Sequence, residues 1–303
     1  MTLGLALQAL TGVTPSTAVA EPPPRPAPIA LVAAGDIACP PGQRTTLTTC
    51  HQRDTGGLAA RLRPTIVAPL GDNQYPAGTP VAYTRSFGPA WGRLKSRMRP
   101  AVGNHEYLTP RAAGYFSYFG SPAAPPNGWY SYDLGAWHVI VLNTNCAFVG
   151  CGPGSPQDSW LRSDLGSHAA VCTLAYFHHP RFTSSGFTPA QARYLKSATL
   201  TFWNALYAYG ADVVVNAHAH VYERFAPQDV WGRPDPVRGI RQFTVGSGGA
   251  NHDRFVRVAR NSQARSGAFG VLELTLEARS YRWRFLTAPS GRLRDAGSAR
   301  CHG

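Results

Sequence analysis

The chain contains 303 residues, 44% of them hydrophobic, so it can bury the core of one large domain or two smaller ones. Its formal net charge is +13, carried almost wholly by arginine, since Lys95 and Lys196 are the only lysines. The arginines are scattered, without the basic runs or aromatic platforms that a nucleic-acid-binding module needs. Beyond the first 20 residues, no apolar run approaches the length of a membrane-spanning helix.

The N-terminal segment, residues 1–20, is typical of a signal peptide. An apolar run from Leu3 to Leu10 is followed by Ala18-Val19-Ala20, which fits the small-residue cleavage pattern. No Lys or Arg precedes the apolar run, so a buried core helix and a start site further upstream stay open as alternatives. Residues 21–28 are a Pro-rich linker. We therefore expect a secreted, periplasmic or extracellular protein whose single domain spans residues 29–303.

Six cysteines also fit an oxidising compartment. They allow fifteen disulfide connectivities, among which sequence alone cannot choose. The simplest pairing joins the two close pairs, Cys39 with Cys50 and Cys146 with Cys151, which leaves Cys172 for Cys301. None lies in a Cys-x-x-Cys arrangement, so a zinc knuckle or a thioredoxin-like redox site is not expected.

The first hundred residues of the domain repeat one pattern three times: an apolar run, then glycine, then a side chain that can bind a metal ion. The apolar runs are residues 29–34, 65–70 and 98–102, and they lead into Gly35-Asp36, Gly71-Asp72 and Gly103-Asn104. Helical stretches are predicted between them, at about 55–63 and 81–94. Apolar strands alternating with helices indicate βαβ units, in which sites form beyond the carboxyl ends of the strands.

The second half begins with a predicted antiparallel hairpin, residues 129–135 and 137–143, followed by a helix at 155–165. Two further predicted strands end in histidine. Residues 172–177 lead into His178-His179, and residues 212–215 lead into Asn216-Ala217-His218-Ala219-His220, after a helix at about 189–209. Three more strands are predicted at 242–245, 271–276 and 281–286. No internal repeat or second compositional block appears, which indicates one α/β domain.

Side chains that can bind metal ions therefore gather at the ends of successive strands. They are Asp36, Asp72, Tyr75, Asn104, His178, His218 and His220. Singly, each has a structural explanation, because Gly-Asp and Asn are common in turns and two histidines can lie on a surface loop. Together, oxygen and imidazole donors without a thiolate suit iron, manganese or zinc, and they are too many for one tetrahedral zinc. They fit two ions about 3.5–4 Å apart that share a carboxylate.

These blocks, in this order, resemble the calcineurin-like metallophosphoesterase superfamily, and most of all the purple acid phosphatases. Tyr75 follows the second aspartate by three residues, and Glu223-Arg224 follows the paired histidines, as in the purple enzymes. Ala38 stands where many other branches have a histidine, so Tyr75 is expected to take that ligand position. The resemblance implies a four-layer αββα sandwich, in which helices flank two mixed β-sheets.

The resemblance also implies roles for individual residues. One ion, Fe³⁺ in the purple enzymes, would be held by Asp36, Asp72, Tyr75 and His220. Asp72 would bridge to a second, divalent ion (iron, zinc or manganese), held also by Asn104, His178 and His218. His105 would donate a proton to the leaving group. His179, His105 and Asn104 would contact substrate. Either ring of the pair His178-His179 could bind metal, and the His-x-Pro spacing of the family favours His178.

The function that the resemblance implies is a secreted di-metal phosphatase, which hydrolyses phosphate monoesters by attack of a metal-bound hydroxide. Two carboxylates and a phenolate would oppose the five positive charges of a ferric–divalent pair, leaving about +2 to attract a small phosphorylated substrate. A phosphodiesterase or nucleotidase that uses the same site is the first alternative. A non-catalytic metal- or phosphate-binding protein is more remote, because it would predict damaged ligand positions and every expected position is occupied. Specificity is expected from loops at 146–154 and 183–188.

Overall fold

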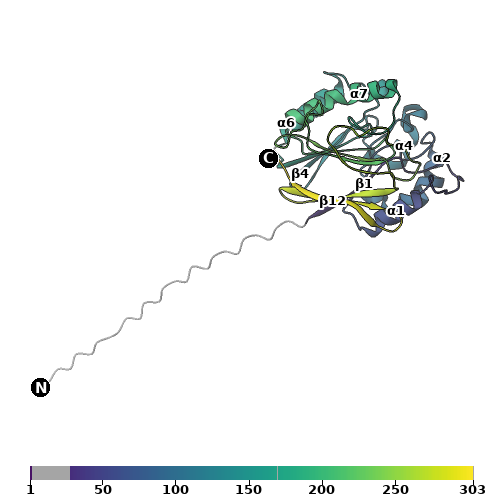
Figure 1. Ribbon diagram of the computed structural model, residues 1–303, viewed down its shortest axis with the longest axis horizontal. Helices are drawn as coiled ribbons and strands as arrows, with labels where there is room; N and C mark the ends of the chain where they lie inside the picture. Colours follow the sequence, from purple (N-terminus) through teal and green to yellow (C-terminus); the bar gives the residue numbers. More distant parts are fainter. Residues whose placement is uncertain (2–27, 169, 303) are drawn as a thin grey trace.

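The computed structural model describes residue 1, residues 28–168 and residues 170–302 (Figure 1). The predicted signal peptide and most of the Pro-rich linker lie outside the described residues. Across the described residues the predicted α/β class is confirmed, and the strands form two mixed sheets.

The first sheet has five strands in the order β12-β11-β10-β1-β2. β1 pairs in parallel with β2, with Leu31 opposite Ile66, and all other neighbours in this sheet are antiparallel. The strands are β1 (Ile29–Ala34), β2 (Ile66–Pro69), β10 (Gly270–Leu276), β11 (Ser280–Thr287) and β12 (Arg292–Arg300).

The second sheet has seven strands in the order β3-β4-β5-β6-β8-β7-β9. The four central neighbours β4, β5, β6 and β8 are parallel, and both edges are antiparallel, including the predicted β3–β4 hairpin. The strands are β3 (Tyr130–Leu134), β4 (Trp137–Val141), β5 (Cys172–Tyr176), β6 (Val213–Asn216), β7 (Tyr222–Phe225), β8 (Arg241–Val245) and β9 (Ser262–Ser266).

The sheets pack face to face because alternate residues of each strand point to opposite sides. In β1, Leu31 and Ala33 face the core between the sheets, whereas Val32 packs with Leu58 of the helix α1 (Gln52–Arg61). In β4, Val139 and Val141 enter the same central core, and Ile140 packs on the other side with Leu161 of α6 (Pro156–Ser167) and Phe202 of α7 (Pro189–Ala208). Helices thus cover both outer faces, as Figure 1 shows for α6 and α7 on one side and α1 on the other. The four-layer sandwich is confirmed.

The longer helices begin at residues that satisfy free backbone N–H groups. Ser155 caps α6, and Thr188 caps α7 through a capping box with Gln191. The α-helices are α1 (Gln52–Arg61), α2 (Pro80–Ala82), α3 (Gly88–Trp91), α4 (Ala113–Phe119), α5 (Cys146–Val149), α6 (Pro156–Ser167) and α7 (Pro189–Ala208).

The stretch predicted as helical at 81–94 is divided into short pieces. A π-helical turn, η1 (Tyr83–Phe87), separates α2 from α3, and a 3₁₀ helix, η2 (Gly92–Arg97), follows. Pro89, in the first turn of α3, has no N–H to donate to the preceding turn, which interrupts the regular hydrogen-bond ladder at this point. Residues 98–102 likewise form only two isolated bridges to the β2 region, on either side of Pro100. The other 3₁₀ turns are η3 (Glu106–Leu108), η4 (Pro110–Ala112) and η5 (Ser121–Ala123).

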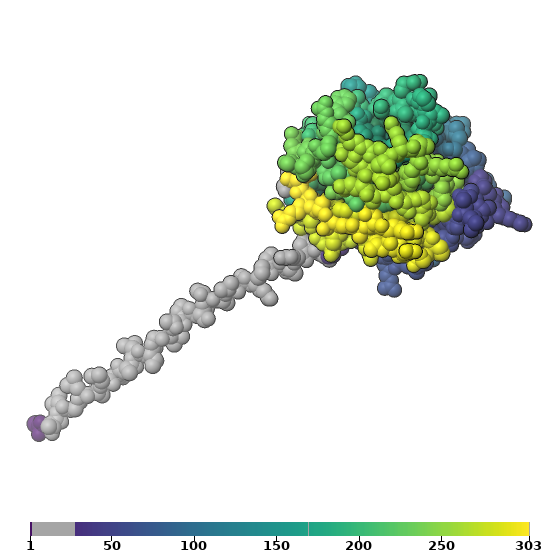
Figure 2. Space-filling model, in the orientation of Figure 1, coloured from purple at the N-terminus to yellow at the C-terminus, as the bar shows by residue number. Residues whose placement is uncertain are grey.

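Three disulfides join the cysteines as the simplest pairing predicts: Cys39–Cys50, Cys146–Cys151 and Cys172–Cys301. The last bridge fastens the end of β12 to the start of β5, and so ties one sheet to the other. Figure 2 shows the C-terminal segment (yellow) as a continuous band over one face of the molecule. Among the described helices, none is both long enough and apolar enough to cross a membrane.

Candidate metal centre

The predicted ligands lie on loops that leave the carboxyl ends of neighbouring strands in both sheets. Asp36 follows β1, Asp72 follows β2, His178 follows β5, and His218 and His220 follow β6. Asp36, Asp72 and His218 all adopt positive φ, at 56°, 48° and 64°. Non-glycine residues rarely occupy this region, and strained backbone of this kind concentrates at functional sites.

The loops approach so closely that glycine is required between them. A Cβ on Gly71, whose φ is 91°, would lie 2.7 Å from Nδ1 of His178. A Cβ on Gly103 would lie 2.2 Å from the backbone nitrogen of Asp72. The Gly residues before Asp72 and Asn104 therefore allow the strand ends to converge.

One cluster of donor atoms contains Asp36, Asp72, Tyr75 and His220. The Tyr75 hydroxyl lies 2.7 Å from Oδ1 of Asp36, 3.2 Å from Oδ2 of Asp72 and 3.0 Å from Nε2 of His220. Nε2 of His220 is itself 3.0 Å from Oδ1 of Asp36. The structure thus brings together the four side chains predicted for the first ion.

A second cluster adjoins the first and contains Asn104, His178 and His218. Nε2 of His178 lies 3.1 Å from Oδ1 of Asn104 and 3.2 Å from Nδ1 of His218. The same nitrogen lies 3.2 Å from Oδ2 of Asp72, the oxygen that also faces Tyr75. Asp72 therefore stands between the two clusters, where a bridging carboxylate is expected.

Two imidazoles are held so that Nε2 points inward as an acceptor. Nδ1 of His178 lies 3.0 Å from the carbonyl oxygen of Leu70, which can only accept, so Nδ1 donates the hydrogen. Nδ1 of His220 likewise faces Oδ1 of Asn251, at 2.5 Å. In the neutral rings, the lone pairs on both Nε2 atoms then face carboxylate oxygens. Converging lone pairs repel unless a cation lies between them, so the donor set fits metal ions.

The electrostatics of the site also favour the binding of a cation. Asp36 and Asp72 are fully buried, which by itself raises their pKa values, yet the charges of His220 and His178 respectively lower both. Burial lowers the pKa of His178 and of His220, but the charges of Asp72 and Asp36 respectively outweigh it and raise both to about 9. Without a metal ion, protons on these rings balance the carboxylates, and a bound cation would replace those protons.

His218 and Tyr75 differ from the two charged rings. Burial, together with the charge of His178, lowers the pKa of His218 to about 3, so its ring is neutral and free to act as a ligand. Burial and the charges of Asp36 and Asp72 hold the pKa of the Tyr75 phenol well above its usual range. Ionising the phenol therefore needs a strongly positive ion beside it.

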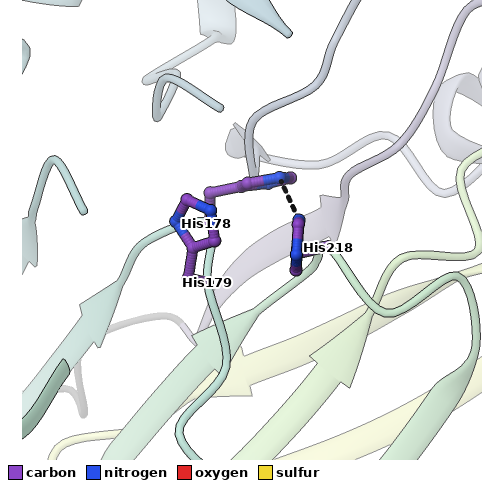
Figure 3. A group of neighbouring side chains, drawn as sticks. All are labelled: His178, His179 and His218. Carbon is purple, nitrogen blue, oxygen red and sulfur yellow. Dashed lines mark hydrogen bonds between the residues drawn. The ribbon is translucent and has the colours of Figure 1, made fainter. Parts of the chain in front are cut away.

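The second histidine of the pair, His179, is buried like His178. Its Nδ1 is 2.7 Å from Oγ1 of Thr144, and its ring centroid is 4.5 Å from that of His218. Ligand nitrogens of His178, His179 and His218 lie within 4.8 Å of one another. Figure 3 shows the three rings grouped together, with a hydrogen bond between His178 and His218. In this arrangement His179 packs against a predicted ligand, and its predicted substrate contact stays a prediction.

His105 lies on the open side of the centre, with its side chain 32% exposed. Its Nδ1 is 2.5 Å from the carbonyl oxygen of Pro76, and its Nε2 is 3.9 Å from Oδ2 of Asp72. The ring packs against Tyr75, with centroids 4.4 Å apart. The backbone N–H of His105 also donates to Oδ1 of Asp72, at 2.8 Å. Nε2 of His105 is thus directed towards the predicted ions without joining either cluster.

Glu106 directly follows His105 in the chain, and no role is predicted for it from the sequence. The structure places its buried carboxylate between the two loops that carry Asp72 and Asn104. It accepts backbone N–H groups of Asp72 (2.9 Å), Asn73 (2.8 Å), Gln74 (3.3 Å) and Gly103 (2.7 Å), and the Tyr83 hydroxyl (3.0 Å). Burial and the charge of Asp72 raise the pKa of Glu106 to about 7, against the lowering effect of these donors.

Two further contacts come from the loop after β8. Asn251 holds Nδ1 of His220, and Asp253 accepts the His220 backbone N–H at 3.0 Å and the Ser185 hydroxyl at 2.9 Å. Asn251 and Asp253 follow the Gly-rich segment 246–249, a turn signal at the end of a predicted strand. This Gly-rich turn is the sequence signal from which the loop at the end of the strand could have been recognised.

Glu223 and Arg224 do not reach the metal-ligand clusters. Glu223 accepts the backbone N–H of Ser184 at 2.8 Å and hydroxyls of Ser184 and Ser262. Arg224 pairs with Asp295 of β12, at 2.7 Å from Nε. Both therefore fasten the strand β7 that follows the histidine loop to its neighbours.

The chain is similar in sequence and in fold to known proteins. A family model described as calcineurin-like phosphoesterase matches residues 29–222. Purple acid phosphatase 18 of Arabidopsis thaliana is 28% identical over 278 residues, covering 84% of this chain and 58% of that protein. Purple acid phosphatase 15 of the same plant is 28% identical over 151 residues, covering 44% of this chain and 27% of that protein. The chain thus spans only part of the length of these two relatives, little more than half of the first and about a quarter of the second.

A similar fold occurs in the solved structure of purple acid phosphatase PPD1 from yellow lupin (Lupinus luteus) seeds. The TM-score is 0.73 at 16% sequence identity, and the match covers 90% of this chain and 54% of that chain. At this level of identity the likeness concerns the fold alone.

Proposed function

The chain belongs to the calcineurin-like phosphoesterase family, and we propose that it is a phosphatase that hydrolyses phosphate monoesters at a pair of metal ions. The observation that carries the proposal is the convergence of acceptor atoms on two adjacent points that share Asp72. Nε2 of His178 and Nε2 of His220 both point into the clusters, because the Nδ1 atoms of these rings donate to Leu70 and Asn251. The purple acid phosphatase relatives support the same class of reaction.

The residues divide between the two ions by cluster. Asp36, Tyr75 and His220 would hold one ion, for which we propose Fe³⁺, because the buried phenol ionises only beside a strong positive charge. Asn104, His178 and His218 would hold a divalent ion, iron, zinc or manganese. Asp72 would contact both. When bound, such a pair lowers the pKa of water to supply a nucleophile and neutralises charge on the phosphoryl oxygens.

The chain's own residues supply the remaining steps. Asn104 and His105 adjoin the open side of the centre, where they can orient the phosphate ester. His105 is fixed through Nδ1 on the Pro76 carbonyl, so in its protonated form Nε2 carries the proton that the leaving alkoxide needs. We retain His179 as a proposed substrate contact, which would require its ring to turn from Thr144.

The experiment that tests the function combines metal analysis with two chromogenic substrates. Purified protein is expected to contain two metal ions per chain and to hydrolyse 4-nitrophenyl phosphate faster than bis(4-nitrophenyl) phosphate. Tyr75 bound to Fe³⁺ should also give a visible absorption band. Faster turnover of the diester would favour the phosphodiesterase alternative. Metal-loaded protein that hydrolyses neither substrate would favour the non-catalytic one.

Replacing His105 by alanine is expected to lower kcat in proportion to how much the leaving group needs a proton. For an alkyl phosphate such as glycerol 2-phosphate, we expect a loss of about 10²-fold, the lower range for general acid catalysis. For 4-nitrophenyl phosphate the loss should be smaller, because nitrophenolate leaves without protonation. The measurement is kcat for both substrates in the variant and in the unaltered protein. Equal losses for both would contradict the role of proton donor.

Export is also proposed. Three disulfides fit an oxidising compartment, where such bridges form and persist. The chain's net charge of +13 would assist encounter with phosphorylated substrates by long-range attraction, although a compositional bias towards arginine explains it equally well.

A further inference from the structure

Two loops hold large apolar side chains out in solvent. Trp231 on one loop is 64% exposed, and Val256 and Val258 on the other are 67% and 65% exposed. All three line one pocket of about 620 Å³, so they lie together although the loops are far apart in the sequence. Single exposed apolar residues are ordinary, but a group of them marks a surface that binds a partner.

Positively charged side chains line the same pocket. Lys196, Arg257 and Arg260 are exposed, and Arg181 is partly buried. Among the described residues that line the pocket, none carries a carboxylate. The exposed apolar and basic side chains are together called the Trp231 surface: Trp231, Val256, Val258, Lys196, Arg257 and Arg260. This surface is complementary to a partner that offers both apolar groups and negative charge.

Trp231 lies in a turn that is closed by hydrogen bonds. Oδ1 of Asp229 accepts the backbone N–H groups of Trp231 and Arg233, both at 2.8 Å. The backbone N–H of Asp229 donates to the carbonyl of Arg233 at 3.0 Å. A turn closed in this way keeps the indole at the surface, where it is available to a partner.

Further hydrogen bonds fasten the second loop in place. The side-chain amide of Asn261, which ends this loop, donates to the carbonyl of Gly232 at 3.0 Å and to Oε1 of Gln228 at 3.1 Å. The backbone N–H of Val256 donates to the carbonyl of Ser184 at 3.1 Å. The two loops are therefore held side by side, and a surface that is already formed needs little ordering when it binds.

Exposure and charge decide between the partners that have apolar surfaces. A small-molecule site encloses most of its ligand, whereas these apolar side chains project into solvent. A second copy of the chain would bring the same cations face to face across a two-fold interface, and like charges disfavour that contact. A lipid bilayer accepts apolar side chains at its interface, where Trp is preferred, and its anionic headgroups attract Lys and Arg.

We propose that the Trp231 surface docks this protein on an anionic lipid bilayer. Its apolar side chains would lie among the headgroups, and its basic side chains would lie against the lipid phosphates. The surface contains no predicted metal ligand, but it adjoins the histidine loop: the Phe187 ring, which lines the pocket, stacks on the His218 ring with centroids 5.3 Å apart. Docking would thus hold the metal centre close to the bilayer. The inference is independent of the proposed hydrolysis.

The test measures the Kd of the metal-loaded protein for vesicles by co-sedimentation at physiological ionic strength. One set of vesicles contains equal parts of phosphatidylglycerol and phosphatidylcholine, and the other contains phosphatidylcholine alone. We expect binding to the anionic vesicles and little binding to the others. Trp231→Ala and the double variant Arg257→Gln/Arg260→Gln should each raise the Kd for anionic vesicles about 10-fold, because each removes one of the two kinds of contact.

Matched controls are needed because a net charge of +13 attracts the protein to any anionic surface. Arg292→Gln/Arg294→Gln removes two exposed arginines of β12, and Leu293→Ala removes an exposed apolar side chain of the same strand. These controls should change the Kd by less than about twofold. Urea unfolding of every variant shows whether it folds, and this readout does not depend on hydrolysis.

Weaker binding in both surface variants, with both controls unchanged, would support docking through the Trp231 surface. If all the variants bound as the unaltered protein does, net charge alone would explain the binding and the assignment would be overturned. Failure to bind either set of vesicles, or equal binding to both, would overturn the anionic bilayer as the partner. A dimer in analytical ultracentrifugation that Trp231→Ala separates would assign the surface to a second copy of the chain instead.

Discussion

Asp72→Ala is expected to abolish both hydrolysis and the binding of at least one metal ion. Oδ2 of Asp72 is the atom that faces both clusters, 3.2 Å from the Tyr75 hydroxyl and 3.2 Å from Nε2 of His178. Metal ions contribute several kcal/mol of transition-state stabilisation, and a loss of about 4 kcal/mol lowers kcat about 10³-fold. The measurements are kcat with 4-nitrophenyl phosphate and metal content per chain by emission spectrometry.

Two further variants keep the Asp72 experiment interpretable. Asp72→Asn preserves the shape of the side chain and should show the same loss, because the amide has no charge to hold two cations. Glu277→Gln removes a partly exposed carboxylate that pairs with Arg282 at 2.9 Å, away from the site, and should leave both measurements unchanged. Normal metal content and turnover in both Asp72 variants would refute the proposed metal centre.

Glu106→Gln is expected to lower both the stability of the protein and metal binding at the same centre, because Glu106 joins the loops that carry Asp72 and Asn104. All five partners of the Glu106 carboxyl group are donors: four backbone N–H groups from the loops of Asp72 and Asn104, and the Tyr83 hydroxyl. A glutamine would turn an NH₂ group towards some of these donors and leave them buried without an acceptor. Leaving a buried donor unsatisfied costs about 1–3 kcal/mol, so we expect a loss of about 3 kcal/mol in the free energy of unfolding. Urea unfolding measures this loss, and the metal content should fall with it.

Glu223→Gln is the matched control for Glu106. Glu223 is an equally buried carboxylate that accepts bonds from Ser184 and Ser262, but it touches neither the Asp72 loop nor the Asn104 loop. We expect it to lower stability comparably while two metal ions remain bound. If Glu106→Gln and Glu223→Gln lowered metal content equally, the positioning role of Glu106 would be wrong, because general destabilisation would explain the loss.

Much of the fold follows from local patterns. β1, β2, β5 and β6 are short apolar runs that end in Gly, Asp, Asn or His, and buried parallel strands have this composition. By contrast, β9 (Ser262–Ser266) and β12 (Arg292–Arg300) were not predicted. Both are edge strands with polar and charged side chains, so they lack the apolar signal, and only pairing with β7 and β11 makes them strands.

The sequence by itself determined which side chains lie at the strand ends. Parallel strands of one sheet present their carboxyl ends at one edge, so Asp36 lies near Asp72 and His178 near His218, whereas the packing of the two sheets brings the two pairs together. The tertiary structure decided those features of the site that depend on contacts between distant segments. Leu70 and Asn251 set which nitrogen of His178 and of His220 points inward, Glu106 joins two loops, and three separate segments build the pocket beside Phe187. The physical reason is that hydrogen-bond direction and cavity shape depend on side chains far apart in the chain, and spacing along the sequence does not encode them.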